Sequence, residues 1–231
     1  MDIKVESENR EINKKILEVK NLTASYKERG TMKQVLKDVS FYVDEGEIVG
    51  LLGDSGSGKT TLCKCILGLV KDYYGVIRHY SNNPQMIFQD PYSALNPKKT
   101  VGWILQEPLK IAKEDNKIAC VEMRRKKVYD ILEEVNLSSE IYNRYPRELS
   151  GGQRQRVCIA LALLTDTKFI LADEPLSALD VTVQAQIMDL IKRLQKERGI
   201  SFLFVSHDLD VVSALCNRII VVKDKSLLSI S

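Results

Sequence analysis

One eight-residue segment, Gly53-Asp-Ser-Gly-Ser-Gly-Lys59-Thr60, constrains this chain more than any other part of its sequence. It follows an apolar run typical of a strand, Ile48–Leu52, and precedes a helical stretch, Thr61–Val70. A strand, a glycine-rich loop and a helix in this order form the context in which the pattern G-x-x-x-x-G-K-[ST] binds phosphates. The glycines let backbone amides surround the phosphates, and the helix N-terminus adds a partial positive charge. The segment therefore predicts a phosphate-binding loop.

Within this loop, Lys59 is expected to reach the β- and γ-phosphates of a nucleotide, and the Thr60 hydroxyl to ligate Mg²⁺. The loop alone leaves kinases, GTPases and helicases open as classes. The residues of the loop predicted to contact the nucleotide are Gly53, Asp54, Ser55, Gly56, Ser57, Gly58, Lys59, Thr60 and Thr61.

A second apolar run ends in two adjacent carboxylates, in the segment Phe169-Ile-Leu-Ala-Asp173-Glu174. The carboxyl ends of strands are where α/β sheets bind ligands. Successive side chains of a strand diverge, so the two carboxylates are expected to do different work. Asp173 is predicted to hold the hydrated Mg²⁺, and Glu174 to orient or deprotonate the attacking water.

Short β-branched runs alternate with helical patterns along most of the chain, which indicates an α/β fold with a mainly parallel sheet. Two β-like stretches, Ile16–Leu22 and Val35–Val43, open the chain. Between Pro91 and Leu149 the strand pattern disappears and helical periodicity replaces it, so this region is predicted to be a helical insertion. The remaining predicted core strands are Met86–Phe88, Phe169–Ala172, Phe202–Val205 and Ile219–Val222.

Length, charge and hydropathy limit the kinds of protein that this chain can be. The 231 residues suffice for one sizeable α/β core. The longest strongly apolar stretch, Cys158–Leu164, is far shorter than the roughly 18 to 20 residues of a membrane helix. The net charge of +3 is too balanced to imply nucleic acid as a partner. Any role at a membrane is therefore expected to be that of a peripheral subunit.

The segment Leu149-Ser150-Gly151-Gly152-Gln153 resembles the signature motif of the ABC ATPases. It precedes a stretch predicted to be an amphipathic helix, Gln153–Leu164. Ser150 and the glycines would thus present a hydroxyl and amides at a positive helix end, as a second phosphate-binding surface.

Four further residues match the family's motifs in order. Tyr26 resembles the aromatic residue that stacks on adenine, Gln89 the Q-loop glutamine that senses Mg²⁺ and the γ-phosphate, and His207 the switch histidine. Asp180 ends a Ser177-Ala-Leu-Asp180 segment that resembles the D-loop. Structural roles stay open for all four: a half-exposed strand aromatic, a surface amide, and helix caps for His207 and Asp180.

The resemblance covers nearly the whole chain and implies a P-loop ATPase fold with an N-terminal antiparallel β subdomain, a mainly parallel core sheet and an inserted α-helical subdomain. A single domain would span residues 1–231. Its core and β subdomain would comprise residues 14–90 and 150–225, and the helical subdomain residues 91–149 with the signature at its end. The implied ligands are ATP and Mg²⁺, with Glu174 and His207 catalytic, and with Thr60, Gln89 and Asp173 at the metal. In this family the signature closes over the nucleotide of a partner subunit, which implies a dimer.

The type of ABC protein is narrowed by what surrounds the motifs. The single P-loop disfavours the cytosolic ATPases of translation, and the separation of only 89 positions from Lys59 to Glu148 disfavours those of DNA repair. The segment before the signature disfavours exporters. The segments Gln89–Pro97 and Thr100–Pro108 resemble the importers of peptides and nickel, while the short stretch 71–84 resembles the metal-chelate branch. The implied partners are integral membrane permeases, a second and different ATPase subunit and an extracytoplasmic solute-binding protein. The implied location is the cytoplasmic face of the cell membrane.

Large apolar side chains follow Gln89 in the chain, and this position suggests a surface that couples the nucleotide site to a permease. The alternative is that they form the core of the helical insertion. The residues concerned are Tyr92, Leu95, Trp103, Ile104 and Leu105.

Overall fold

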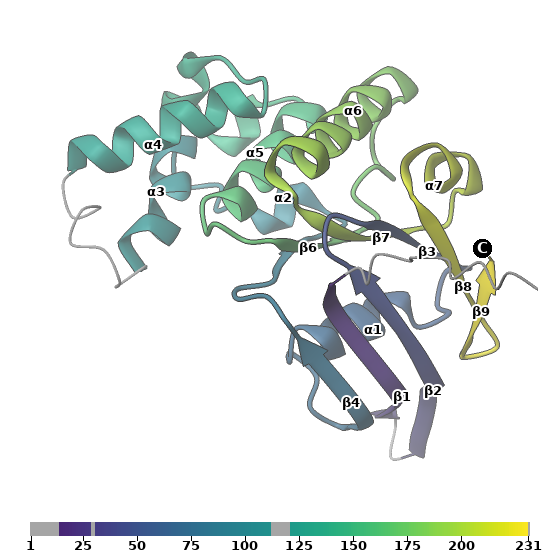
Figure 1. The fold of residues 1–231 in the computed structure, drawn as a ribbon. Coiled ribbons are helices and arrows are strands. Elements are labelled where there is room, and N and C mark those ends of the chain that lie inside the picture. The colour runs from purple at the N-terminus through teal and green to yellow at the C-terminus, as the bar shows by residue number, and fades with distance from the viewer. Residues whose placement is uncertain (1–13, 29–30, 112–120, 231) are drawn as a thin grey trace, which may run out of the picture.

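The computed structural model describes residues 14–28, 31–111 and 121–230, and its centre is a six-stranded sheet in the order β5-β6-β7-β3-β8-β9 (Figure 1). All neighbouring strands are parallel except β8 and β9, which are antiparallel. The prediction of a mainly parallel core is therefore confirmed. The strands are β3 (Ile48–Leu52), β5 (Gln85–Ile87), β6 (Phe169–Asp173), β7 (Ser201–Ser206), β8 (Arg218–Lys223) and β9 (Ser226–Ile230).

Strand β9 was not expected, because the turn before it lacks the usual residues. Asp224 and Lys225 connect β8 to β9 with φ angles of 51° and 69°. Two consecutive positive φ angles define the tight hairpin turn that Asn-Gly or Asp-Gly normally occupies. Lysine in the second position hides this turn from a reading of the sequence.

A separate antiparallel sheet has the order β2-β1-β4 and comprises β1 (Lys15–Glu28), β2 (Thr31–Asp44) and β4 (Tyr73–His79). The expected antiparallel β subdomain is thus present, but β1 continues well past the predicted end at Leu22. Asn21 has a φ of 50°, and register shifts on both sides of Leu22 interrupt the alternation from which the strand was predicted. Strand β4 lies in the segment 71–84, for which the sequence suggested only a shortening.

The core sheet separates two hydrophobic clusters, because successive side chains of a strand point to opposite faces. On β6, Ile170 and Ala172 join the cluster beneath the helical layer, whereas Phe169 and Leu171 join the cluster shared with β1 and β2. Figure 1 shows the same division, with α3 to α6 on one side of the core sheet and α1 with the antiparallel sheet on the other.

Helices alternate with the core strands along the chain. In the region 91–149 the described residues form helices and turns but no strand. Among the described residues, no helix combines the length and apolarity needed to cross a membrane. The helices are α1 (Lys59–Ile66), α2 (Pro91–Ala94), α3 (Val101–Ile111), α4 (Val121–Glu134), α5 (Gly151–Leu163), α6 (Val181–Arg198) and α7 (Leu209–Leu215), with 3-10 turns η2 (Ser139–Asn143) and η3 (Pro146–Glu148).

Two helix predictions were wrong in detail. Helix α1 begins at Lys59 and ends at Ile66, earlier than the predicted range 61–70 at both ends. Helix α5 is not amphipathic, since nine of its residues are buried, including Gln155 and Arg156. It lies at the centre of the helical layer and contacts α2, α3, α4 and α6. Its polar residues suggest a helix with one solvent-exposed face, but Gln155 and Arg156 are buried.

We expect Phe204→Ala to lower the free energy of unfolding by about 3–5 kcal/mol, because Phe204 is fully buried in β7 and its removal leaves a cavity beneath the helical layer. Urea unfolding followed by circular dichroism would measure the change. The matched control is Phe88→Ala, whose side chain is 45% exposed and should cost about 1 kcal/mol or less. Equal losses for the two variants would contradict the placement of Phe204 in the core.

Candidate active site

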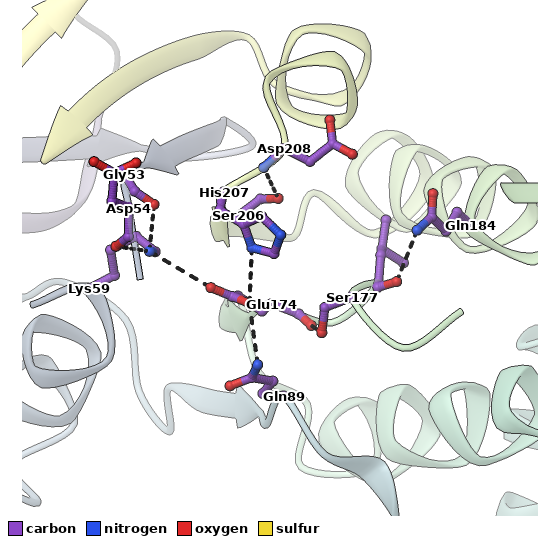
Figure 2. A network of polar contacts seen from close by, with 11 residues as sticks. Gly53, Asp54, Lys59, Gln89, Glu174, Ser177, Gln184, Ser206, His207 and Asp208 are labelled. Atoms are coloured by element: carbon purple, nitrogen blue, oxygen red, sulfur yellow. Dashed lines mark hydrogen bonds and ion pairs between the residues drawn. The ribbon is translucent and has the colours of Figure 1, made fainter. Parts of the chain in front are cut away.

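Four adjacent parallel strands end at one edge of the core sheet, and each delivers one of the predicted motifs. Strand β5 leads to Gln89, β6 to Asp173 and Glu174, β7 to His207, and β3 to the glycine-rich loop. Figure 2 shows Gln89, Glu174 and His207 pointing toward one another beside Lys59. The sheet order therefore brings together residues that lie up to 154 positions apart in the chain, from Gly53 to His207.

The glycine-rich loop holds Lys59 by its own carbonyl groups. The Nζ of Lys59 donates to the carbonyl oxygens of Gly53, at 2.6 Å, and Asp54, at 2.9 Å, and the residue is only 5% exposed. Gly58 caps α1 with a φ of 105°, and a Cβ at this position would lie 2.9 Å from Leu36. Only glycine fits such a backbone against the antiparallel sheet. The ammonium group is thus fixed beside the start of α1.

A pocket of 290 Å³ opens over this loop. Tyr26 from β1 lines it and is 45% exposed, with the Nζ of Lys33 lying 6.0 Å from its ring centroid. A ring so exposed at a pocket wall is available for stacking on a planar base. The pocket is lined by Tyr26, Val35, Ser55, Gly56, Gly58, Lys59, Thr60, Thr61, Gln89 and Glu174.

The Glu174 carboxylate is the meeting point of the site. Its Oε2 accepts a hydrogen bond from Nε2 of Gln89 at 3.3 Å and lies 3.2 Å from Nδ1 of His207. Its Oε1 lies 3.7 Å from Nζ of Lys59. Glu174 has a φ of 46°, and its amide donates to the Val205 carbonyl at 3.0 Å. A left-handed backbone is uncommon outside glycine, so this turn holds the carboxylate in place at some cost in free energy.

Asp173 differs sharply from its neighbour, because it is buried, at 4% exposure. Burial raises the pKa of its carboxyl group above the ordinary value; a hydrogen bond with Thr60 opposes this rise and the Glu174 charge adds to it. One oxygen, Oδ1, is buried without a hydrogen-bond partner among the described residues. Buried carboxylates without partners are costly unless a cation compensates them. The residues present therefore fit a divalent cation at Asp173 and Thr60.

The signature residues lie away from this pocket. Ser150 is exposed and caps α5: its Oγ accepts from the amide of Gln153 at 3.2 Å, and its own amide donates to Oε1 of Gln153 at 3.0 Å. A Cβ on Gly152 would lie 2.5 Å from Val183, so this glycine also permits close packing of α5 on α6. None of Ser150, Gly151, Gly152 and Gln153 is among the residues that line the pocket over the loop.

Asp180 and His207 differ in their capping roles. Asp180 caps α6 through the amide of Val183, at 3.0 Å, so the structural role left open for it is present. His207 does not cap α7; Asp208 does, by accepting from the amides of Asp210 and Val211. His207 is instead free to contact Glu174.

Ser177, named in the sequence only as part of the D-loop segment, and Gln184, which the sequence did not single out, hold the turn after Glu174. The Oγ of Ser177 donates to the Glu174 carbonyl at 3.0 Å. Nε2 of Gln184 donates to the carbonyls of Leu176 and Leu179 at 3.1 and 3.2 Å. Gln184 lies one helical turn after Asp180, which is the one signal that could have drawn attention to it.

The fold and the site together define the class: an α/β nucleotide hydrolase with a phosphate-binding loop. A family model described as "ABC transporter" matches residues 36–177, more than half of the chain. The chain belongs to the ABC transporter family and is an ATP-binding, ATP-hydrolysing cassette.

Named relatives and solved structures agree with this family. The chain is 43% identical to the oligopeptide transport ATP-binding protein OppF of Bacillus subtilis, over 90% of this chain and 72% of that protein. It is 40% identical to OppF of Streptococcus pyogenes serotype M1, over 91% of this chain and 73% of that protein.

Among solved structures, a dimeric post-hydrolysis ATP-binding cassette, MJ0796 bound to ADP and Pi, matches with a TM-score of 0.82 and 31% identity, over 94% of this chain and 99% of that one. The structure of cbiO1 from Clostridium perfringens, part of the transporter complex cbiONQ, matches with a TM-score of 0.80 and 28% identity, over 93% of this chain and 87% of that one.

Replacing Lys59 by alanine should weaken ATP binding roughly 10- to 100-fold, because a charge-assisted contact to the phosphates is lost. Titration with a fluorescent ATP analogue would measure the dissociation constant. Lys64→Ala, which removes an exposed ammonium group from the same helix, is the matched control and should bind ATP normally. Unchanged affinity in the Lys59 variant would remove the loop from the binding site.

Proposed function

We propose that this chain powers the import of peptides by hydrolysing MgATP as a peripheral subunit of a membrane permease. The observation that carries the catalytic part is the Glu174 carboxylate, which is held by Gln89, His207 and Lys59 at the edge of the pocket. The peptide substrate is supported by the names of the relatives at 40–43% identity. The sequence also suggested nickel or a metal chelate, and a metal chelate has weaker support, from a solved structure described as a putative metal-chelate type ABC transporter at 27% identity.

In the proposed chemistry, Glu174 is the base that takes a proton from the attacking water. A carboxylate can do this only if it stays oriented toward the water, and the contacts from Gln89 and His207 hold it in place. His207 is the second catalytic residue, placed to stabilise charge as the γ-phosphoryl group leaves. Lys59 and the amides of the loop bind the phosphates, and Tyr26 stacks on adenine.

We assign the Mg²⁺ that accompanies ATP to Thr60, Asp173 and Gln89. The unpartnered Oδ1 of Asp173 and the hydroxyl of Thr60 supply hard oxygen ligands, the kind that Mg²⁺ prefers. When bound, the ion supplies positive charge that offsets the charge developing on the phosphates. Gln89 contributes an amide oxygen from a loop, so its position can report whether the site is filled.

The signature surface is proposed to act on the nucleotide of a second, homologous ATPase subunit. Ser150, Gly151, Gly152 and Gln153 lie outside the chain's own pocket, and the exposed Ser150 stands at the N-terminus of a long helix. Amides at such an end attract phosphate. Asp180, the proposed D-loop aspartate, lies between Leu179 and the start of α6, and Leu179 and Val183 pack against Gly151 and Gly152 of the signature. A dimeric arrangement of the similar cassette MJ0796 supports this assignment.

Glu174→Gln should preserve ATP binding and slow hydrolysis by roughly 10²- to 10⁴-fold, since an amide cannot accept the proton from water. It should also trap an ATP-bound dimer, detectable by light scattering. Glu197→Gln, at an exposed position on α6, is the matched control and should turn over normally. If the Glu174 variant hydrolyses ATP at the rate of the unaltered protein, another group is the base.

The permease is proposed to dock in a groove of 630 Å³ between the helical layer and β5. The groove is largely apolar and includes Trp103, Ile104 and Pro108 of α3 with Leu161 and Leu164 beside them. Trp103 stays 37% exposed and lies between two ammonium groups, with Nζ of Lys99 at 4.5 Å and Nζ of Lys110 at 5.0 Å from its ring centroid. An exposed aromatic beside an apolar groove is a typical anchor for a partner helix.

The apolar cluster after Gln89 divides between the two roles that the sequence left open. Leu95, Ile104 and Leu105 are at most 6% exposed and belong to the core of the helical layer. Leu95, at 1% exposure, therefore cannot be a surface anchor for the permease. Tyr92 is exposed but does not line the groove.

Trp103→Ala should weaken association with the cognate permease at least about 10-fold, as for a central aromatic anchor, and leave the hydrolysis rate of the isolated ATPase subunits unchanged. Pull-down with the permease and a phosphate-release assay would measure the two quantities. The control is Tyr74→Ala, an 82%-exposed aromatic on β4. Normal permease association in the Trp103 variant would place the docking surface elsewhere.

The remaining proposals concern the whole transport system. A peripheral place at the cytoplasmic face of the membrane and an extracytoplasmic solute-binding protein follow from the import role, and no nucleic acid partner is proposed. A mixed dimer with a different ATPase subunit is preferred to two copies of this chain. Reconstitution with the cognate permease and solute-binding protein, followed by uptake of a labelled peptide with a nickel chelate as competitor, would test substrate and partners together.

A further inference from the structure

A contact between α2 and α5 connects Gln89 to Ser150, and the chemistry proposed above makes no use of it. The guanidinium carbon of Arg154 lies 4.7 Å from the ring centroid of Tyr92. Tyr92 is 53% exposed, and its hydroxyl has no hydrogen bond among the described residues. A tyrosine in the permease groove would be explained by docking, but Tyr92 lies outside that groove. Among the described residues, the Tyr92 ring interacts with the guanidinium group of Arg154.

On the Gln89 side, Tyr92 is tied to the glutamine through a short, rigid path. Asp90, the next residue after Gln89, caps α2 by accepting the Tyr92 amide at 2.9 Å. The Oγ of Ser93 donates to the Asp90 carbonyl at 3.1 Å, and Pro91 fixes the first turn. When Gln89 moves, the one-turn helix that carries Tyr92 is therefore expected to move with it.

On the Ser150 side, Arg154 is the residue that joins the turn before the signature to the helix after it. Its Nε donates to the Pro146 carbonyl at 2.7 Å, its Nη2 to the Arg147 carbonyl at 3.5 Å, and its amide to the Ser150 carbonyl at 3.0 Å. Pro146 and Arg147 belong to η3, which leads directly to Ser150. The position of the Arg154 side chain thus bears on how Ser150 is presented.

We propose that Arg154 is a positioning residue that, through the ring of Tyr92, couples the state of Gln89 to the presentation of Ser150. The inference rests on the proposed function, in which Gln89 reports a filled pocket and Ser150 closes on the nucleotide of the partner. Binding of ATP in one subunit would then favour that subunit's own signature surface for dimerisation. The coupling is a cation–π contact, which restrains the guanidinium without a hydrogen bond and so tolerates sliding between α2 and α5.

The alternative is purely local: Arg154 satisfies the carbonyls of η3, and Tyr92 only covers its apolar stem. The two accounts differ for variants of Tyr92, which leave the hydrogen bonds to Pro146 and Arg147 intact. They also differ in additivity, because residues that act through one contact lose their effect once the partner is gone.

The test uses three variants: Tyr92→Ala, Arg154→Met and the double variant. Each is made in a Glu174→Gln parent and purified; if the dimer contains a different ATPase subunit, that subunit is added. Light scattering at increasing MgATP gives the concentration that half-saturates dimerisation. We expect each single variant to raise this concentration roughly 3- to 30-fold, and the double variant to be no worse than the more affected single one. Binding of a fluorescent ATP analogue to the undimerised chain should stay within about 2-fold. Tyr92→Phe and Tyr92→Trp, which keep an aromatic face, should dimerise like the parent.

The outcomes separate cleanly. Normal dimerisation of Tyr92→Ala, or additive losses in the double variant, would overturn the coupling and leave the proposed function standing. Failure of the parent itself to dimerise with MgATP would overturn the proposed function and this inference with it. If Arg154→Met unfolds, the Tyr92 series decides alone, because its side chain is exposed and lies outside the hydrophobic core.

Discussion

The parallel alignment of β5, β6, β7 and β3 is the constraint on which the active site depends. Parallel strands all end at the same edge, so neighbouring strands deliver their following residues side by side whatever their distance in the chain. Gln89, Glu174, His207 and the phosphate loop owe their proximity to this order alone. A slip of one position between β6 and β7 would turn the inward side chains of a strand outward and separate Glu174 from Val205, whose carbonyl holds its amide.

Within that frame, two adjacent carboxylates have opposite surroundings. Asp173 still belongs to β6 and is buried, with the Thr60 hydroxyl beside it, whereas Glu174 has left the strand in a left-handed turn and faces three polar partners. The change of backbone conformation between the two residues gives them the different surroundings on which their proposed roles depend. One is suited to bind a cation, and the other to accept a proton from water.

The sequence predicted the parts of this arrangement that obey local rules. The phosphate loop, the core strands and the helical insertion each follow from periodicity or from glycine spacing, and so their places were close to right. Strand β9 was missed because Lys225 adopts a positive φ angle that lysine rarely takes. The second half of β1 was missed because Asn21, a residue more typical of turns, lies inside the strand at a positive φ angle. Helix α5 was misjudged because Gln155 and Arg156 are polar yet buried. Burial of polar residues is decided by tertiary packing, for which a single sequence carries no periodic signal.

The division of the interior into two clusters by the core sheet has a consequence for how such a protein can change. Side chains beneath α3 to α6 share no cavity with those between the sheet and β1, because the backbone of the sheet stands between them. Changes in side-chain packing on the helical side therefore leave the cluster between the core sheet, α1 and the antiparallel sheet in place. The packing beneath α3 to α6 can therefore differ without moving the side chains that support the phosphate loop from the other face of the sheet.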